Sequence, residues 1–159
     1  LSRSISRNAP RPLGEEKSDC PAQKVSRNVA TEQTDQTAPP TILVIDDEAD
    51  IRGLLRLALE EAGYRVLESC DGEEGLAMAK RERCALAIVD LFMPGKEGLE
   101  TIFAFRRDMP AVKLMAMSGG SGHTDMLPVA SSFGADGTIQ KPFELDTLLA
   151  TIAALLDTP

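Results

Sequence analysis

The feature of the sequence that most constrains its fold is an apolar run that ends in one aspartate. Residues 85–89 read Ala-Leu-Ala-Ile-Val, Asp90 follows directly, and Met93-Pro94-Gly95 is a turn signal. A strand with one face in water would alternate apolar and polar residues, so this run is typical of a parallel strand buried on both faces. Asp90 then lies at the carboxyl end, where open α/β sheets bind ligands. A single aspartate there is more often a turn residue or a helix cap, so its role depends on the rest of the chain.

Strand and helix patterns alternate along the chain after residue 40. Strands are predicted over 42–45, 64–69, 85–90, 112–117 and 135–140, and helices over 51–62, 71–83, 98–107, 124–133 and 145–156. Strands that alternate with helices form right-handed βαβ crossovers, which build one parallel sheet with helices on both faces. We therefore predict an α/β fold with a five-stranded, parallel, doubly wound sheet.

Local patterns assign faces and ends to these helices. The first helix is expected to face the core with residues at helical spacing, which are Ile51, Leu54, Leu55, Ala58, Leu59 and Ala62. Leu99, Ile102 and Phe103 are expected to share one face of the third helix. Asp71 and Glu74 fit a capping box at the start of the second, and Gly63 fits the left-handed residue that often follows a helix.

Residues 1–40 differ from the rest of the chain in composition. They hold half of the ten prolines, are rich in Ser, Thr, Gln, Asn and Arg, and show no periodicity. This is typical of a disordered segment, so we predict a disordered tail over 1–40 and one domain over 41–157. The first residue is Leu1 rather than a methionine, which fits processing, a fragment boundary or an added expression segment equally well.

Composition argues against several classes of function. The net charge is −8, and the acidic excess falls after residue 40. Direct nucleic-acid binding is therefore not expected, because it depends on neutralising phosphates. The cysteines Cys20, Cys70 and Cys84 lack metal-ligand spacing, which suits a reducing compartment. The chain has no apolar run long enough to span a membrane and no secretion signal, so we expect a cytoplasmic protein with protein or metal partners.

Polar side chains follow four of the five predicted strands. Asp46 and Asp47 follow the first strand, Asp90 ends the third, Ser118 follows the fourth and Lys141 follows the fifth. Each of them alone is compatible with an ordinary solvated position. The carboxyl ends of parallel strands meet at one edge of a sheet, however, so we expect these side chains to converge.

The predicted cluster indicates phosphoryl chemistry with a metal ion. Three close carboxylates repel one another, and hard oxygen ligands of this kind favour Mg²⁺. A carboxylate oxygen can then attack a phosphoryl group whose oxygens contact Lys141 and Ser118. Asp90 is the best nucleophile because it ends the most apolar central strand, whereas the adjacent Asp46 and Asp47 are better placed to bind the metal.

Residues 41–157 resemble the receiver domains of two-component response regulators, in particular the single-domain chemotaxis regulators. The resemblance rests on four motifs in order, which are Val-Ile-Asp-Asp-Glu over 44–48, Val-Asp-Leu-Phe-Met-Pro-Gly-Lys-Glu-Gly over 89–98, Met-Ser-Gly over 117–119 and Lys-Pro-Phe over 141–143. It implies a flavodoxin-like (β/α)5 sandwich. It also implies a signalling phosphoprotein that is not an enzyme and promotes only its own phosphorylation and dephosphorylation.

The resemblance assigns a role to each of the acidic residues. Asp90 would accept a phosphoryl group from a histidine kinase or a histidine phosphotransfer protein. Mg²⁺ would be bound by Asp46, Asp47, Asp90 and the backbone carbonyl of Phe92.

The resemblance also assigns the switch. Ser118 would be the hydroxyl that reports phosphorylation, Lys141 would pair with Asp90 and then with the phosphoryl group, and the Lys141–Pro142 peptide bond would be cis. Related proteins often carry an aromatic residue three positions before this lysine, where this chain has Thr138. A threonine cannot fill an aromatic-sized pocket, so either the switch uses another element, such as the loop over 119–122, or its coupling to the output surface is weak.

Two other interpretations stay open. An interaction module that keeps the fold without phosphorylation is compatible with Thr138, although the other motif residues argue against it. A dehalogenase-type phosphohydrolase would carry its nucleophile on the first strand, together with a cap for which this chain has no segment. His123 is assigned no role. Only residues 157–159 follow the last helix, so we expect the output to be an unidentified partner protein, a homodimer or a domain removed by truncation.

Overall fold

The computed structural model describes residues 38–93, 98–119 and 126–158. Its strands are β1 (Thr41–Ile45), β2 (Arg65–Ser69), β3 (Leu86–Asp90), β4 (Lys113–Gly119) and β5 (Gly137–Lys141). Its helices are α1 (Ala49–Glu61), α2 (Gly72–Glu82), α3 (Gly98–Asp108), α4 (Leu127–Ser132) and α5 (Leu145–Asp157). The predicted tail up to residue 37, most of the loop over 119–122, and His123 lie outside the described residues, so the predicted domain boundary stays a prediction.

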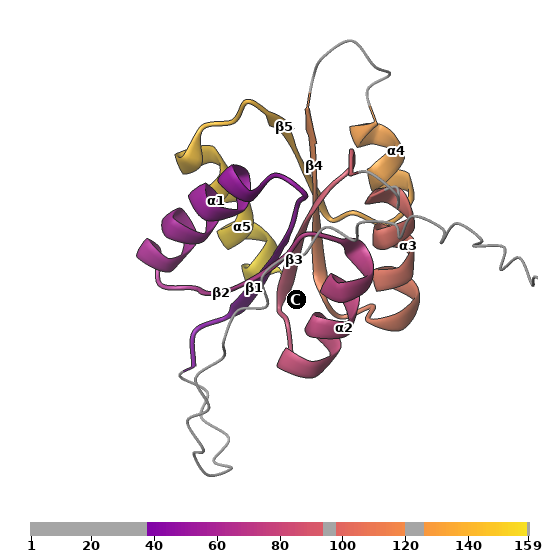
Figure 1. Cartoon of the computed structure of the whole chain (residues 1–159), viewed down its shortest axis with the longest axis horizontal. Coiled ribbons are helices and arrows are strands. Elements are labelled where there is room, and N and C mark those ends of the chain that lie inside the picture. The colour runs from indigo at the N-terminus through magenta and orange to yellow at the C-terminus, as the bar shows by residue number, and fades with distance from the viewer. Residues whose placement is uncertain (1–37, 94–97, 120–125, 159) are drawn as a thin grey trace, which may run out of the picture. The chain divides into compact units, whose positions relative to one another are not determined.

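The five strands lie parallel in one sheet in the order β2-β1-β3-β4-β5, which confirms the predicted fold class. The chain leaves β1 through α1 on one face of the sheet and leaves β3 through α3 on the other (Figure 1). β1 and β3 are neighbours, so the chain diverges to opposite faces between them. This point of divergence is where open α/β sheets bind ligands.

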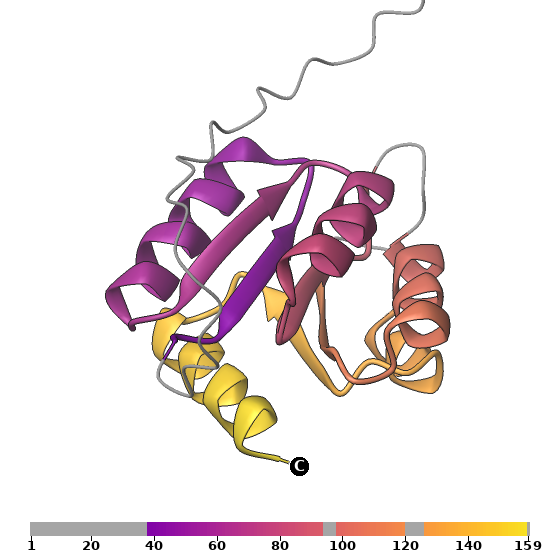
Figure 2. The ribbon, with the colours of Figure 1, turned by 90° about the horizontal axis from the view of Figure 1, so that it is seen from below.

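Two apolar layers hold the helices to the sheet. Figure 2 shows α1 and α5, in indigo and yellow, on one face, and α2, α3 and α4 on the other. The first layer contains Leu55 and Leu59 of α1 and Leu148 and Ile152 of α5. The second contains residues from all three opposite helices, namely Ala79, Ile102, Phe105 and Ala130.

The central strands are buried throughout, as the apolar run before Asp90 predicts. All residues of β1 and β3 are buried. Alternate side chains enter opposite layers, because Ala87 and Val89 pack in the α2–α3–α4 layer while Leu86 and Ile88 pack in the α1–α5 layer. The sheet therefore has no solvent face along β1 and β3, and Asp90 lies at the end of a fully buried strand.

Three residues expected on the apolar faces of their helices lie at the surface. Leu54 is 45% exposed and Ala62 is the exposed C-cap of α1, and only Leu55 and Leu59 of that helix are fully buried. Phe103 is 55% exposed, whereas Phe105 is 0% exposed. The buried face of α3 contains Gly98, Thr101, Ile102 and Phe105, and Leu99 packs beside it. The prediction was therefore right for Leu99 and Ile102 and wrong for Phe103.

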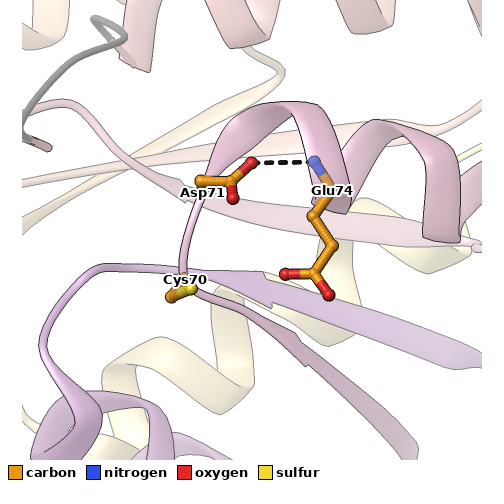
Figure 3. Close-up of side chains that lie close together, drawn as sticks. All are labelled: Cys70, Asp71 and Glu74. Carbon is orange, nitrogen blue, oxygen red and sulfur yellow. Dashed lines mark hydrogen bonds between the residues drawn. The ribbon is translucent and has the colours of Figure 1, made fainter. Parts of the chain in front are cut away.

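The start of α2 uses half of the predicted capping box. Asp71 accepts a hydrogen bond from the backbone nitrogen of Glu74 at 2.8 Å (Figure 3). The Glu74 carboxylate does not return to the Asp71 nitrogen but accepts a hydrogen bond from the Ser69 hydroxyl, which in turn accepts from the Asp71 nitrogen. Gly63 has a φ of 90°, as expected for a residue that follows a helix.

Candidate functional site

The candidate site lies at the carboxyl ends of β1, β3, β4 and β5. Asp46 directly follows β1, and Asp90 ends β3. Ser118 is the second-to-last residue of β4, and Lys141 ends β5. Asp46, Asp90 and Ser118 are buried, with 0%, 3% and 5% of their surfaces exposed. The two buried carboxylates need partners, because burying a charge without a partner costs free energy.

Lys141 is the cation that joins these strands. Its Nζ lies 2.9 Å from Oδ2 of Asp46 and 3.2 Å from Oδ2 of Asp90. Glu48 is a weaker third partner, with its Oε1 3.5 Å from Nζ and 62% of its side chain exposed. The ammonium thus bridges the two buried carboxylates of neighbouring central strands, as predicted for Lys141 and Asp90.

Backbone groups orient the two buried carboxylates. The backbone nitrogen of Glu48 donates to Oδ1 of Asp46 at 2.8 Å, and the backbone nitrogen of Phe92 donates to Oδ1 of Asp90 at 3.3 Å. Each carboxylate therefore has one oxygen toward its own loop and the other toward Lys141. Both carboxylates therefore point toward the ammonium of Lys141.

The pKa shifts follow from burial and from this shared cation. Burial raises the pKa of the Asp46 carboxyl, while hydrogen bonds from Lys141 and the Glu48 backbone act in the opposite direction. Burial would lower the pKa of the Lys141 ammonium, but its hydrogen bond to Asp46 and the charges of Asp46 and Asp90 outweigh burial and raise it. One ammonium serves two buried carboxylates, so the site attracts further positive charge.

Asp46, Glu48 and Asp90 form a group whose carboxylate oxygens lie within 4.8 Å of one another. Three hard oxygen donors at this spacing fit Mg²⁺. Asp47, which we predict as a ligand, is exposed and outside this group. Glu48 was missed, although its place after the acidic pair and at the N-cap of α1 offered a signal. The roles of Asp47 and of the Phe92 carbonyl as metal ligands stay predictions.

The two predicted switch residues lie on adjacent strands. β4 extends to Gly119, so Ser118 is part of the strand rather than of the following loop, and it lies opposite Gln140 of β5. Thr138 lies opposite Ala116 and is exposed. The Lys141–Pro142 peptide bond is cis, as the resemblance implies. The switching roles of Ser118 and Thr138 stay predictions.

A second group of possible ligands lies at the carboxyl end of β2. Cys70 offers its Sγ and Asp71 and Glu74 offer carboxylate oxygens, all within 4.8 Å of one another (Figure 3). This corrects the expectation that no cysteine lies in metal-ligand spacing. Both carboxylates already serve the start of α2, because Asp71 caps the helix and Glu74 accepts from Ser69.

The fold and motifs match a known family. The model of the response regulator receiver domain matches residues 42–153. This chain therefore belongs to that family and contains a receiver domain of the two-component response regulators.

Individual relatives agree with this assignment. The probable transcriptional regulator ycf27 of Porphyridium aerugineum is 41% identical over 117 residues, which cover 72% of this chain and 47% of that protein. A CheY-like receiver domain protein from Methanospirillum hungatei JF-1 has a TM-score of 0.69 and 32% identity, covering 75% of this chain and 94% of its own. The chemotaxis protein CheY4 of Vibrio cholerae has a TM-score of 0.68 and 30% identity, covering 74% of this chain and 99% of its own.

The chain spans about half the length of the curated relatives it matches. Among the described residues, the longest helices fall short of the length and apolar character that crossing a membrane requires.

Proposed function

We propose that this receiver domain accepts a phosphoryl group onto Asp90 in a Mg²⁺-dependent reaction and passes the signal on by a change of conformation. The observation that carries the proposal is the position of the Asp90 carboxylate. It is buried, ends the central strand, and shares Lys141 with Asp46 at 3.2 Å and 2.9 Å respectively. The donor is a histidine kinase or a histidine phosphotransfer protein in the cytoplasm, and the chain turns over no other substrate.

The transfer exchanges one bond to phosphorus for another. An oxygen of Asp90 forms a bond to phosphorus as the bond between phosphorus and the donor's imidazole nitrogen breaks. The electron pair of the broken bond stays on the imidazole, which takes up a proton from solvent. The products are an aspartyl phosphate and a free histidine, so the step needs no oxidant or other reactant.

The residues around Asp90 have separate tasks in this step. Lys141 already contacts Asp90 and can follow the new negative charge onto a phosphoryl oxygen, because its ammonium is a compact cation on a flexible side chain. The hydrogen bond from the Phe92 backbone fixes one carboxylate oxygen. Ser118, buried on the neighbouring strand, is the hydroxyl that would respond to the phosphoryl group.

The donor set around Asp90 supports Mg²⁺ as the cofactor. The carboxylates of Asp46, Glu48 and Asp90 offer hard oxygen ligands, and Lys141 neutralises only part of their charge. Asp47 and the Phe92 carbonyl remain the further ligands that we expect. When bound, Mg²⁺ would supply positive charge to the phosphoryl oxygens.

The proposed output of the domain is a change of conformation. Phosphorylation adds about −1.5 to −2 charges at Asp90, and the response is a shift between conformations of one fold. Relatives named as transcriptional regulators are about twice as long as the part that this chain matches. We therefore propose that the signal passes to a separate partner, to a second copy or to a linked segment.

Intact mass spectrometry tests the proposal. The protein is incubated with acetyl phosphate and Mg²⁺, beside an Asp90→Asn variant and a sample with excess chelator. We expect one phosphoryl adduct that is absent from the variant and from the chelated sample. An unmodified wild-type protein that binds Mg²⁺ in a separate titration would contradict the proposal and favour an interaction module that has lost phosphorylation.

A further inference from the structure

Arg52 reaches back from α1 to the loop that carries the acidic residues. Its Nη1 donates to the backbone carbonyl of Asp46 at 2.7 Å and to that of Asp47 at 3.1 Å. Its own backbone nitrogen donates to the carbonyl of Glu48 at 3.1 Å, within the first turn of the helix. One residue of α1 thus holds three consecutive carbonyls of the loop between β1 and α1.

These carbonyls lie where the chain leaves the sheet. Asp46 is fully buried, so its backbone groups need partners inside the protein. Its backbone nitrogen donates to the backbone carbonyl of Ser69 in β2 at 3.2 Å, and its carbonyl accepts from the guanidinium of Arg52. The direction of the Asp46 carboxylate depends on this backbone, because the following turn brings the Glu48 nitrogen onto Oδ1.

The side chain of Arg52 donates to backbone carbonyls rather than to carboxylates, and this affects metal binding. The two side-chain contacts of Arg52 leave the carboxylate oxygens of Asp46 and Asp47 available to other groups. A guanidinium that paired directly with a carboxylate would instead compete with a metal ion for it. Arg52 therefore supplies order to the loop without occupying the ligands.

We propose that Arg52 is a positioning residue for the metal site. Its Nη1 fixes the peptide groups of Asp46 and Asp47 so that the acidic loop is arranged for Mg²⁺ before the ion binds. This inference rests on the proposed function, because it concerns the same metal site. Partners that orient metal ligands without touching the metal typically contribute about 10-fold or more in affinity.

The alternative effect of Arg52 has the opposite sign. A cation close to the acidic loop repels Mg²⁺, so a purely electrostatic role predicts that removing the charge strengthens Mg²⁺ binding. Positioning predicts weaker binding. The sign of the change in the Mg²⁺ dissociation constant therefore separates the two roles.

Isothermal titration calorimetry with Mg²⁺ alone tests the inference on the full chain. We expect Arg52→Met to raise the dissociation constant about 10-fold. Arg52→Lys should stay within about 3-fold of the wild type, because its ammonium can donate to the same carbonyls. Arg56→Met is the matched control. Arg56 lies one turn further along α1 and pairs with the Glu60 and Glu68 carboxylates, so its loss should leave Mg²⁺ binding unchanged.

Two outcomes would overturn the positioning role. The first is an unchanged or lower dissociation constant in Arg52→Met, and the second is an equal increase in Arg56→Met. Thermal unfolding without Mg²⁺ checks that each variant is folded. If Arg52→Met is unfolded, Arg52→Gln takes its place, because its short side chain also loses the contacts but stays polar.

A kinetic measurement separates this inference from the proposed function. With acetyl phosphate as donor, Arg52→Met should need more Mg²⁺ for half-maximal phosphorylation but reach the wild-type rate at saturating Mg²⁺. A lower rate at saturation with unchanged Mg²⁺ dependence would contradict positioning. If the wild type binds Mg²⁺ but gains no phosphoryl group, the proposed function fails while calorimetry still decides the role of Arg52.

Discussion

Lys141 is the residue on which the charge balance of the site depends. Its side chain is 15% exposed, whereas those of its partners Asp46 and Asp90 are 0% and 4% exposed. Water therefore screens these carboxylates poorly, and each would be costly without a counterion. Lys141 thereby holds the two buried carboxylates together at the carboxyl ends of β1 and β3.

Removal of Lys141 should destabilise the metal-free protein more than the metal-bound one. We expect Lys141→Met to lower the free energy of unfolding by about 3 kcal/mol without Mg²⁺, because two buried carboxylates lose their cation. Saturating Mg²⁺ should recover part of this loss, since it binds the folded state and neutralises the same groups. Chemical denaturation with and without Mg²⁺ measures both quantities. An equal loss under both conditions would mean that the metal does not share the site with Lys141.

Cys84 should make stability depend on alkaline pH. Burial raises the pKa of its thiol from 9.0 to about 11, despite opposing backbone hydrogen bonds. The thiol ionises first in the unfolded chain, so its contribution to stability is complete below pH 9.0 and is lost as the pH rises toward 11. We expect the free energy of unfolding to fall more steeply in this window for the wild type than for Cys84→Ala. Parallel curves for the two proteins would show that Cys84 does not titrate as expected.

For single residues, the sequence predicts which side chains meet at the site better than it predicts which side chains are buried or which further groups they contact. Asp46, Asp90 and Lys141 converge as predicted. Each follows or ends a strand that the sequence pattern predicts, and the carboxyl ends of parallel strands meet at one edge of the sheet. Glu48 was missed since its approach to Lys141 depends on the turn into α1. Phe103 was predicted to share a face with Leu99 and Ile102 but is exposed, because the buried face of α3 includes small and polar residues that carry no apolar signal.

Two glycines show how closely the elements approach the site. A Cβ on Gly98, the first residue of α3, would lie 2.1 Å from the backbone oxygen of Asp90 and 2.6 Å from the Cα of Leu91. A Cβ on Gly53, within α1, would meet nothing within 4 Å. α3 can therefore begin directly against the residue that we propose as the phosphoryl acceptor only because Gly98 lacks a side chain.

Alanine substitution at these glycines should have opposite effects. Gly98→Ala should lower the free energy of unfolding by about 2 kcal/mol or more and slow phosphorylation of Asp90, because backbone atoms cannot yield as a flexible side chain does. Gly53→Ala should raise it by about 0.5–1 kcal/mol through helix propensity. Thermal unfolding and acetyl phosphate kinetics on both variants give the comparison. Wild-type stability and rate in Gly98→Ala would contradict the close packing of α3 on β3.

The sequence predicts which helices and strands form more reliably than it predicts where each one ends. The sheet and its helices follow from apolar runs, helical spacing and the handedness of crossovers. β4 runs to Gly119, two residues beyond the predicted end, because pairing with β5 continues past the last apolar residue. Pairing between strands is a tertiary property, so the composition of β4 alone could not reveal where it stops.

At the scale of the whole molecule, the apolar layers and the site that the described residues form lie within 41–157. Both clusters of buried residues and the contacts of Lys141 fall within this range. A chain that begins at residue 38 should therefore keep the thermal midpoint of the full chain within about 2 °C, because it retains every element of the sheet. Differential scanning calorimetry of the two chains provides the measurement. A large drop in the midpoint would show that residues 1–37 contribute to the stability of the domain.

The central claim is that Asp90 receives the phosphoryl group, and chemical mapping of the modified residue tests it most directly. After incubation with acetyl phosphate and Mg²⁺, borohydride reduction converts an aspartyl phosphate into homoserine, which peptide mass spectrometry can locate. We predict homoserine at position 90 alone, and none in a sample without Mg²⁺. Modification of Asp46 or Asp47 instead, or its absence from position 90, would contradict the account of this site.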